Sequence, residues 1–211
     1  MYSLSAIVLA GGKSSRMGKD KALLAIQGVP LLKRVCDVAS SLCDAVYVVT
    51  PTPEKYQHLA LKNSQFVREV PLSQETLSIP SSTKVTLPLP HGPLVGFAQG
   101  LAVVKTDWVL LLACDLPKLQ VEVLQDWAEE LENVPQEAIA ALPRQEKGWE
   151  PLCGFYRHGC LPVLNAFIAQ GGRSFQTWLV QHPVHVLSLP NAEILFNCNT
   201  PEDLAFVDDT R

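Results

Sequence analysis

The 211-residue sequence has few charged side chains and lacks the patterns that mark several classes of protein. Charged residues make up 18% of the chain and the net charge is −4, so the sequence offers no overall positive field for binding nucleic acid. No apolar run approaches the ~20 residues that a helix needs to span a bilayer. Hydrophobic residues nevertheless make up 47%, which predicts a sizeable core and argues against global disorder.

Cysteine is present six times, but no two cysteines form a Cys-x-x-Cys pair, and no histidine lies at zinc-finger spacing from them. A structural zinc site is therefore not expected. Residues 1–12 lack the basic n-region and the long apolar stretch of a secretory signal. We therefore expect a cytoplasmic protein whose cysteines are free thiols, most of them buried.

Strand-like apolar runs alternate with helix-like segments along most of the chain. The runs predict strands at 5–10, 45–50, 108–113, 138–142, 151–156, 184–189 and 194–196. Apolar residues at helical spacing, with proline in several first turns, predict helices at about 30–43, 93–102, 119–133, 161–170, 173–182 and from 201 onward. This alternation predicts the α/β class, with a mostly parallel central sheet covered on both faces.

A stretch from 71 to 90 breaks this alternation, because it is rich in serine, threonine and proline and has little periodicity. The strand–helix pattern resumes directly after it, so the stretch does not mark a boundary between domains. We expect a single domain over residues 1–211, with 71–90 as a loop insertion.

The first predicted strand ends in the sequence LAGGKSSRMGKDKALL, residues 9–24, which holds a glycine pair and four cationic side chains. Glycines after a strand let the backbone approach a ligand and direct its N–H groups at anionic oxygens. Arg16 can hold phosphate oxygens through two parallel hydrogen bonds, and Lys21 can act as a point charge. The spacing from Gly12 to Gly18 is one residue too long for a Walker A loop. A phosphate-binding loop is the favoured interpretation, and a solvated basic turn is the alternative.

A carboxylate follows the most hydrophobic strand, where WVLLLAC runs into Asp115. An unpaired charge in an apolar setting costs several kcal/mol. A bound Mg²⁺ would offset that cost, because Mg²⁺ favours one or two carboxylates together with phosphate oxygens. The alternative role is a helix cap ahead of Pro117. Gly11 and Asp115 both lie just past the ends of apolar strands, where ligands bind in parallel sheets.

Two asparagines precede the last predicted helix, in the sequence NCNTP of residues 197–201. Thr200 is a good N-cap with Pro201 at the first helical position. If residues 194–196 form a strand, alternation directs Asn197 and Asn199 to the same side, where they could bind a ligand or complete a metal shell.

Taken together, these motifs resemble the nucleotidyltransferases of sugar nucleotides and cofactors, whose mark is L-A-G-G-x-S-x-R-M-G-x-x-K. The resemblance covers essentially the whole chain, and it is carried by LAGGKSSRMGKDKALL at 9–24, GPLVG at 92–96, CDLP at 114–117, EPL at 150–152 and NCNTPEDL at 197–204. Within this group the chain resembles most the molybdenum cofactor guanylyltransferase family. The resemblance implies a three-layer, Rossmann-like α/β/α nucleotidyltransferase fold and transfer of GMP from GTP to the phosphate of molybdopterin.

The resemblance also implies a nucleotide-binding role for the first loop. Leu9, Ala10 and Gly11 would cup the guanine nucleotide with backbone groups, and Gly12 would let the loop turn under the phosphates. The sequence departs from the family in two places. Val49-Thr50-Pro51 stands where the family tends to have an asparagine, and Glu69 stands near the position of a nucleotide-contacting aspartate, which it could replace.

Catalytic roles are implied for three further residues. Arg16 and Lys21 would hold the triphosphate, and Asp115 would bind both Mg²⁺ and the nucleotide. Asn197 and Asn199 would lie near the phosphate of the molybdopterin substrate and the metal.

Three other functions stay open at this point. The same fold could serve a cytidylyltransferase that acts on molybdopterin or a nucleotidyltransferase that acts on sugar phosphates. From a different class, the chain could be a nucleotide-binding regulatory subunit without turnover. Transient contact with molybdenum-inserting proteins or molybdoenzymes would fit the implied reaction, whereas nucleic acid and membranes are not expected as partners.

Overall fold

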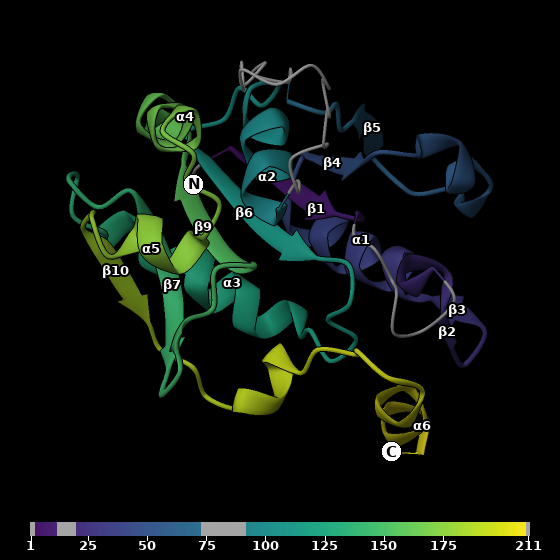
Figure 1. Ribbon diagram of the computed structural model, residues 1–211. Helices are drawn as coiled ribbons and strands as arrows, with labels where there is room; N and C mark the ends of the chain where they lie inside the picture. The colour runs from purple at the N-terminus through teal and green to yellow at the C-terminus, as the bar shows by residue number, and fades with distance from the viewer. Residues whose placement is uncertain (1–2, 12–19, 73–91, 210–211) are drawn as a thin grey trace, which may run out of the picture.

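The computed structural model describes residues 3–11, 20–72 and 92–209, and within these ranges a central sheet carries helices on both faces (Figure 1). The strands of this sheet are β1 (Leu4–Leu9), β4 (Ala45–Thr50), β5 (Ser64–Arg68), β6 (Trp108–Ala113), β7 (Ala140–Gln145), β8 (Gly148–Trp149), β9 (Cys153–Arg157) and β10 (Val184–Leu187). A small separate hairpin consists of β2 (Ala25–Ile26) and β3 (Val29–Pro30). The α-helices are α1 (Leu31–Leu42), α2 (Pro93–Leu101), α3 (Val121–Glu130), α4 (Leu161–Ala169), α5 (Phe175–Leu179) and α6 (Pro201–Asp209).

The strands of the sheet follow the order β10-β7-β9-β6-β1-β4-β5, and β8 pairs with β7. The pairs β1–β4, β1–β6, β4–β5 and β7–β10 are parallel. Strand β9 runs antiparallel to both of its neighbours, β6 and β7, and β8 runs antiparallel to β7. The predicted mostly parallel sheet is therefore confirmed.

The two central strands, β1 and β6, are buried along their whole length. Alternate side chains of β1 enter different cores: Ala6 and Val8 pack into one, and Ile7 and Leu9 pack into the other. A strand that is apolar on both faces is stable only when helices cover both faces of its sheet. The continuous apolar runs in the sequence thus account for the layered architecture.

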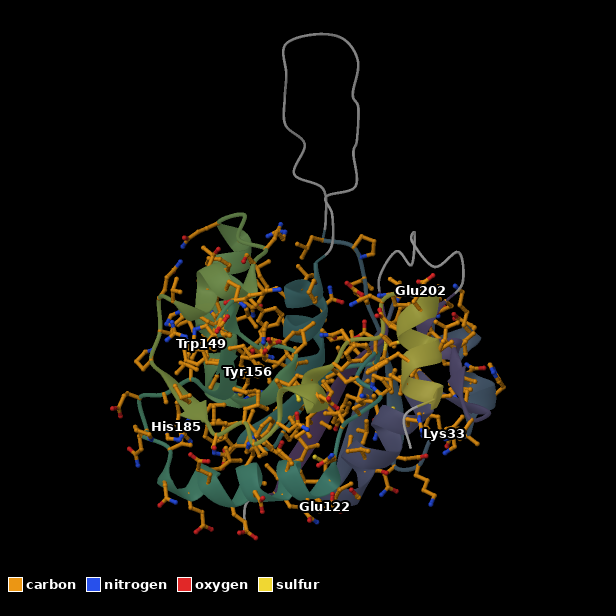
Figure 2. All side chains as sticks on the ribbon, turned by 90° about the horizontal axis from the view of Figure 1, so that it is seen from below. Lys33, Glu122, Trp149, Tyr156, His185 and Glu202 are labelled. Carbon is orange, nitrogen blue, oxygen red and sulfur yellow. The ribbon has the colours of Figure 1, made fainter. Side chains whose placement is uncertain are left out.

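The helices are divided between the two faces of the sheet. Leu32 of α1 and Trp127 of α3 belong to the same core as Val8, whereas Phe97 of α2, Leu164 of α4 and Trp178 of α5 share the core of Ile7. In Figure 2, α3 runs along one side of the sheet with Glu122 pointing away from it, while the side chain of Tyr156 lies inside the protein. The predicted three-layer α/β/α arrangement is confirmed.

One predicted strand is wrong. Residues 194–196 do not form a strand, because Ala192–Leu195 is a 3₁₀ helix. The side chain of Asn191 accepts a hydrogen bond from the backbone N–H of Glu193 and caps this turn. The consecutive residues Ile194 and Leu195 are both buried. The capped turn thus buries both apolar side chains without pairing to the sheet.

The register of the sheet brings the first loop and Asp115 to the same edge. In the parallel pair of β1 and β6, Leu9 lies opposite Ala113. The backbone N–H of Cys114 then donates to the carbonyl oxygen of Leu9 at 3.2 Å. Gly11 lies two residues after Leu9, and Asp115 lies two residues after Ala113. The structure therefore confirms the expectation that the carboxyl ends of both strands meet at one edge.

Helix α2 packs so closely on the sheet that Gly100 leaves no room for a side chain. A Cβ at this position would lie 2.8 Å from Cγ2 of Val49 and 3.1 Å from Cδ1 of Ile7, both of which are buried. We expect Gly100→Ala to lower the free energy of unfolding by roughly 1–2 kcal/mol, since overpacking outweighs the gain in helix propensity. Urea denaturation measures this change. Gly159→Ala is the matched control, because nothing lies within 4 Å of a Cβ there; an equal effect of the two substitutions would contradict the packing argument.

Candidate active site

Three side chains that are far apart in the sequence meet at the carboxyl edge of β1 and β6. Nζ of Lys21 donates a hydrogen bond of 2.6 Å to Oδ1 of Asn199 and lies 3.6 Å from Oδ2 of Asp115. Lys21 lies in the turn after the first loop, Asp115 lies at the end of β6, and Asn199 lies in the segment before α6. The sequence motifs predicted these three residues for one site, and the structure places them in contact.

The carboxylate of Asp115 is largely shielded from water, with 18% of its side chain exposed. Burial raises the pKa of this carboxyl group above its ordinary value, and the nearby ammonium of Lys21 acts in the opposite direction. Burial is the larger of these two influences, so the Lys21 ammonium offsets only part of the desolvation cost of the ionised carboxylate. Such a group favours a further positive partner, and a bound cation would supply one.

Asn199 is held by the backbone of the segment around it. The N–H of Cys198 donates to the carbonyl oxygen of Asp115 at 3.0 Å, which ties the asparagine segment to the end of β6. Oδ2 of Asp203 accepts hydrogen bonds from the N–H groups of Asn199 and Thr200, both at 2.8 Å. The hydroxyl of Thr200 in turn accepts from the N–H of Asp203 at 3.1 Å. These reciprocal bonds form a capping box and confirm Thr200 as the predicted N-cap.

The two predicted asparagines have different contacts. Asn197 and Asn199 are both exposed on either side of the buried Cys198, although the segment is not a strand. Asn199 reaches Lys21, whereas the amide of Asn197 donates to the carbonyl oxygen of Leu195 at 3.2 Å. The structure therefore brings Asn199 into direct contact with the site and leaves Asn197 two residues away along the chain.

A hydrogen-bond network that no sequence motif predicts supports Lys21 from the other side. Lys21–Leu23 is a short 3₁₀ helix whose N-cap is Asp20, which accepts from the N–H of Ala22 at 3.2 Å. Oδ2 of Asp20 also accepts a hydrogen bond of 2.9 Å from the hydroxyl of Tyr56 and lies 3.5 Å from Nζ of Lys55. The turn that carries Lys21 is thus anchored to the segment after β4.

Lys118, which follows the CDLP motif, is a second support that the sequence did not reveal. Its ammonium lies 5.5 Å from the ring centre of Phe196 and 4.5 Å from that of Phe206, and it pairs with Glu193 at 3.3 Å. Cation–π contacts of this kind stabilise a partly buried amine. Lys118 therefore fastens the segment before α6, and α6 itself, to the end of β6.

Some of the backbone N–H and C=O groups at the end of β1 are already hydrogen-bonded within the sheet. The N–H of Ala10 donates to the carbonyl oxygen of Val49 at 2.9 Å, and the carbonyl oxygen of Leu9 accepts from Cys114. The side chains of Leu9 and Ala10 are buried, whereas Gly11 is exposed. A carbonyl oxygen can accept a second hydrogen bond, but the N–H of Ala10 is already used. Contacts with a ligand here fall to the carbonyl oxygens and to Gly11.

The carboxylate of Glu69 lies beside Gly11. A Cβ on Gly11 would stand 3.0 Å from Oε2 of Glu69 and 3.1 Å from Cδ of Pro51. A Cβ on Gly96, in the first turns of α2, would stand 3.5 Å from Cδ of the same glutamate. This carboxylate therefore lies between the end of β1 and α2, with its tightest approach at Gly11. The two positions at which the sequence departs from the family pattern, Pro51 and Glu69, thus meet beside Gly11.

Several predicted features lie outside the described residues. These are Gly12 and Arg16 in the first loop, together with its other two cationic residues, Lys13 and Lys19. Most of the predicted 71–90 insertion also lies outside, since the description stops at residue 72 and resumes at residue 92.

The cysteines are free thiols, as predicted, and five of the six are buried while Cys114 is half-buried. Burial raises the pKa of Cys36 and of Cys160 to about 12, and it also raises the pKa of Cys114 beside the site. A thiol with a raised pKa is a poor nucleophile. Among the described residues no helix has both the length and the apolar character to cross a membrane.

Comparison with known proteins shows the family to which the chain is similar. The model of the MobA-like NTP transferase domain matches residues 6–186. A protein from Nostoc sp. named probable molybdenum cofactor guanylyltransferase is 62% identical over 98% of this chain and 91% of its own length. One of the same name from Synechococcus elongatus is 42% identical over 95% and 96%. The crystal structure of molybdopterin-guanine dinucleotide biosynthesis protein A from Archaeoglobus fulgidus superimposes with a TM-score of 0.72 over 97% of both chains, at 22% identity, and shows the same fold.

We expect Asp115→Asn to stabilise the ligand-free protein at neutral pH. Since burial raises the pKa of Asp115 in the folded state, the carboxyl group favours folding when protonated and loses that contribution as the pH rises through the folded pKa. Asparagine has no charge to bury. The melting temperature should rise by roughly 1–3 °C at pH ~8, and the gain should shrink as the pH falls toward ~4.

Differential scanning calorimetry across this pH range tests the expectation. Asp126→Asn is the matched control, because it makes the same chemical change on the exposed side of α3. If Asp115→Asn is less stable than the unsubstituted protein at pH ~8, the attraction between Asp115 and Lys21 outweighs the desolvation cost of the carboxylate.

Proposed function

The chain belongs to the MobA-like NTP transferase family, and from this premise we propose that it transfers GMP from GTP to the phosphate of molybdopterin, releasing pyrophosphate. The observation that carries the proposal is the meeting of Lys21, Asp115 and Asn199 at the carboxyl edge of β1 and β6. A cation, a carboxylate and an amide at this edge suit a ligand that is both highly anionic and metal-bound. Relatives at 62% and 42% identity carry the name of this activity.

In the proposed reaction an oxygen of the molybdopterin phosphate attacks the α-phosphorus of GTP. The new bond forms between that oxygen and the α-phosphorus, and the bond from the α-phosphorus to the bridging oxygen of the β-phosphate breaks. The attacking phosphate is already ionised at neutral pH, so no strong general base is required. The task left to the protein is to position the two anions and to neutralise the charge that develops on pyrophosphate.

Lys21 is the described cation best placed for that neutralisation. Its ammonium is fixed by Asn199 and Asp115 before any substrate arrives, so little reorganisation is needed when the triphosphate binds. Arg16 is proposed as a second phosphate ligand on the basis of its place in the LAGGKSSRMGKDKALL motif. Asn199, with Asn197 close by in the chain, is proposed to face the phosphate of molybdopterin.

The residues at the site fit a divalent cation, and we propose Mg²⁺. Mg²⁺ prefers one or two carboxylates and takes its remaining ligands from substrate phosphates and water. Asp115 supplies a carboxylate whose pKa is raised by burial and which therefore favours a cationic partner. When bound, the cation would supply charge neutralisation on the nucleotide oxygens. The side chain of Asp115 is the group proposed to hold it.

Selection of guanine is proposed to rest on Glu69. Guanine presents two adjacent donors, N1–H and the N2 amino group, to which a carboxylate can bind with both oxygens. Cytosine and adenine place an acceptor beside their amino group, and that acceptor repels the second carboxylate oxygen. The carboxylate of Glu69 lies beside Gly11, next to the loop proposed to bind the nucleotide. Leu9, Ala10 and Gly11 complete this side of the proposed site with their backbone groups.

The location and partners of the protein stay proposals as well. GTP and molybdopterin are the proposed substrates, and the cytoplasm is the proposed location. Proteins that insert molybdenum or receive the product are proposed as transient partners.

The proposal is tested by incubating the purified protein with molybdopterin, Mg²⁺ and one nucleoside triphosphate at a time. We expect pyrophosphate release and a product heavier by one GMP with GTP, at a rate roughly tenfold or more above that with CTP or ATP. Pyrophosphate release and mass spectrometry measure the two products.

Each alternative gives a different result in this assay. Faster turnover of CTP would identify a cytidylyltransferase. Turnover that needs a sugar phosphate in place of molybdopterin would move the protein to another substrate class. Binding of GTP without pyrophosphate release under any of these conditions would indicate a regulatory subunit.

A further inference from the structure

The side chain of Gln99 binds the backbone directly after Glu69 with both ends of its amide. Oε1 of Gln99 accepts a hydrogen bond of 2.9 Å from the N–H of Val70, and Nε2 donates one of 2.7 Å to the carbonyl oxygen of Val70. This is the pattern that a neighbouring β-strand residue would make. Gln99 lies on α2, so it joins this helix to the chain that leaves β5.

This paired contact begins where the sheet stops. The N–H of Glu69 donates to the carbonyl oxygen of Thr50 at 2.9 Å, and β5 itself ends at Arg68. The backbone of Val70 therefore takes its partner from Gln99 instead of from a strand. Glu69 lies between the two fixed points, one on β4 and one on α2. The path of the backbone on both sides of Glu69 is thus set by hydrogen bonds.

The position of the Glu69 carboxylate depends on the same helix. Gly96 stands three residues before Gln99, and a Cβ on Gly96 would lie 3.5 Å from Cδ of Glu69. Helix α2 therefore provides both the surface on which the carboxylate rests and the amide that holds the following residue. A loss of the amide contacts frees the backbone of Val70 while leaving the surface intact.

We infer that Gln99 is a positioning residue for base selection, which holds Glu69 so that its carboxylate accepts hydrogen bonds from both N1–H and the N2 amino group of guanine. This inference rests on the proposed function, because it assigns the base of the nucleotide to the side of the site that holds Glu69. Bidentate binding demands correct placement of both oxygens, whereas a single hydrogen bond tolerates displacement. Gln99 therefore controls discrimination more strongly than it controls affinity.

Inosine triphosphate is the probe that isolates this effect, since hypoxanthine keeps N1–H and lacks only the N2 amino group of guanine. We expect the unsubstituted protein to bind GTP about tenfold or more tightly than ITP, the size of one hydrogen bond to a charged acceptor. Gln99→Leu should weaken GTP binding about fivefold and leave ITP binding nearly unchanged. Isothermal titration calorimetry with Mg²⁺ gives both dissociation constants without requiring turnover.

Gln176→Leu is the matched control. Gln176 makes the same pair of amide contacts with the backbone of Trp149, at 3.2 Å and 2.6 Å, in a different part of the fold. We expect it to leave the ratio of the ITP and GTP dissociation constants as it is in the unsubstituted protein. Gln99→Ala serves as a second variant if Gln99→Leu does not fold, and Glu69→Gln should bring the ratio close to one.

The inference is overturned if Gln99→Leu weakens the binding of GTP and of ITP by the same factor, or weakens the binding of neither nucleotide. It is overturned as well if Gln176→Leu changes the ratio of the two dissociation constants as much as Gln99→Leu does. It is also overturned if the unsubstituted protein does not prefer GTP to ITP. The proposed function can fail separately: a protein that shows the expected ratio but forms no product with molybdopterin refutes the transfer reaction alone. A protein that forms the product while Gln99→Leu keeps the ratio refutes this inference alone.

Discussion

The ammonium of Lys21 is the contact on which the site depends, because it joins three segments that the chain brings from distant positions. Asn199 accepts its hydrogen bond, and Asp115 supplies the opposite charge. A half-buried carboxylate without a cation nearby is costly, and a lysine without acceptors pays the entropy of ordering a long side chain. The three groups are therefore more stable together than apart. They form a preorganised unit before a nucleotide binds.

The sheet makes this unit possible by placing two strand ends at one edge. Leu9 and Ala113 are partners in the parallel pair of β1 and β6, so the residues that follow them emerge side by side. The C-terminal segment then attaches to this edge through the backbone contact of Cys198 with Asp115 and through the Lys118 cluster. The same edge holds Glu69, which follows β5. The groups proposed to bind the phosphates and the base thus lie at the same edge of one sheet.

Much of this arrangement could be predicted from the sequence, and each part that could not has a physical cause. Continuous apolar runs located β4 and β6 correctly, since strands buried on both faces leave a strong signal. The hairpin of β2 and β3 was not predicted, because its turn uses Gln27 and Gly28, both with positive φ, instead of the usual asparagine and glycine.

The site itself was predictable where its residues stand in sequence motifs, and not where residues outside the motifs support it through partners distant in the sequence. Lys21, Asp115 and Asn199 stand in sequence motifs, and the structure brings them together. Gln99 and Tyr56 stand in no motif, and their partners lie 29 and 36 residues away in the sequence. Contacts of this kind depend on the tertiary fold, which a local pattern does not specify. The predicted strand at 194–196 failed for a different, local reason, because the side chain of Asn191 caps a 3₁₀ turn two residues away.

If Lys21 and Asp115 act on the nucleotide as one unit, their effects on turnover are coupled, and a double-mutant cycle measures that coupling. The measurement is kcat/KM for GTP in the release of pyrophosphate, for Lys21→Met, Asp115→Asn and the double variant. We expect the double variant to be about as slow as the slower single variant, because either change disrupts the same unit. Losses that multiply in the double variant would show instead that the two residues act independently.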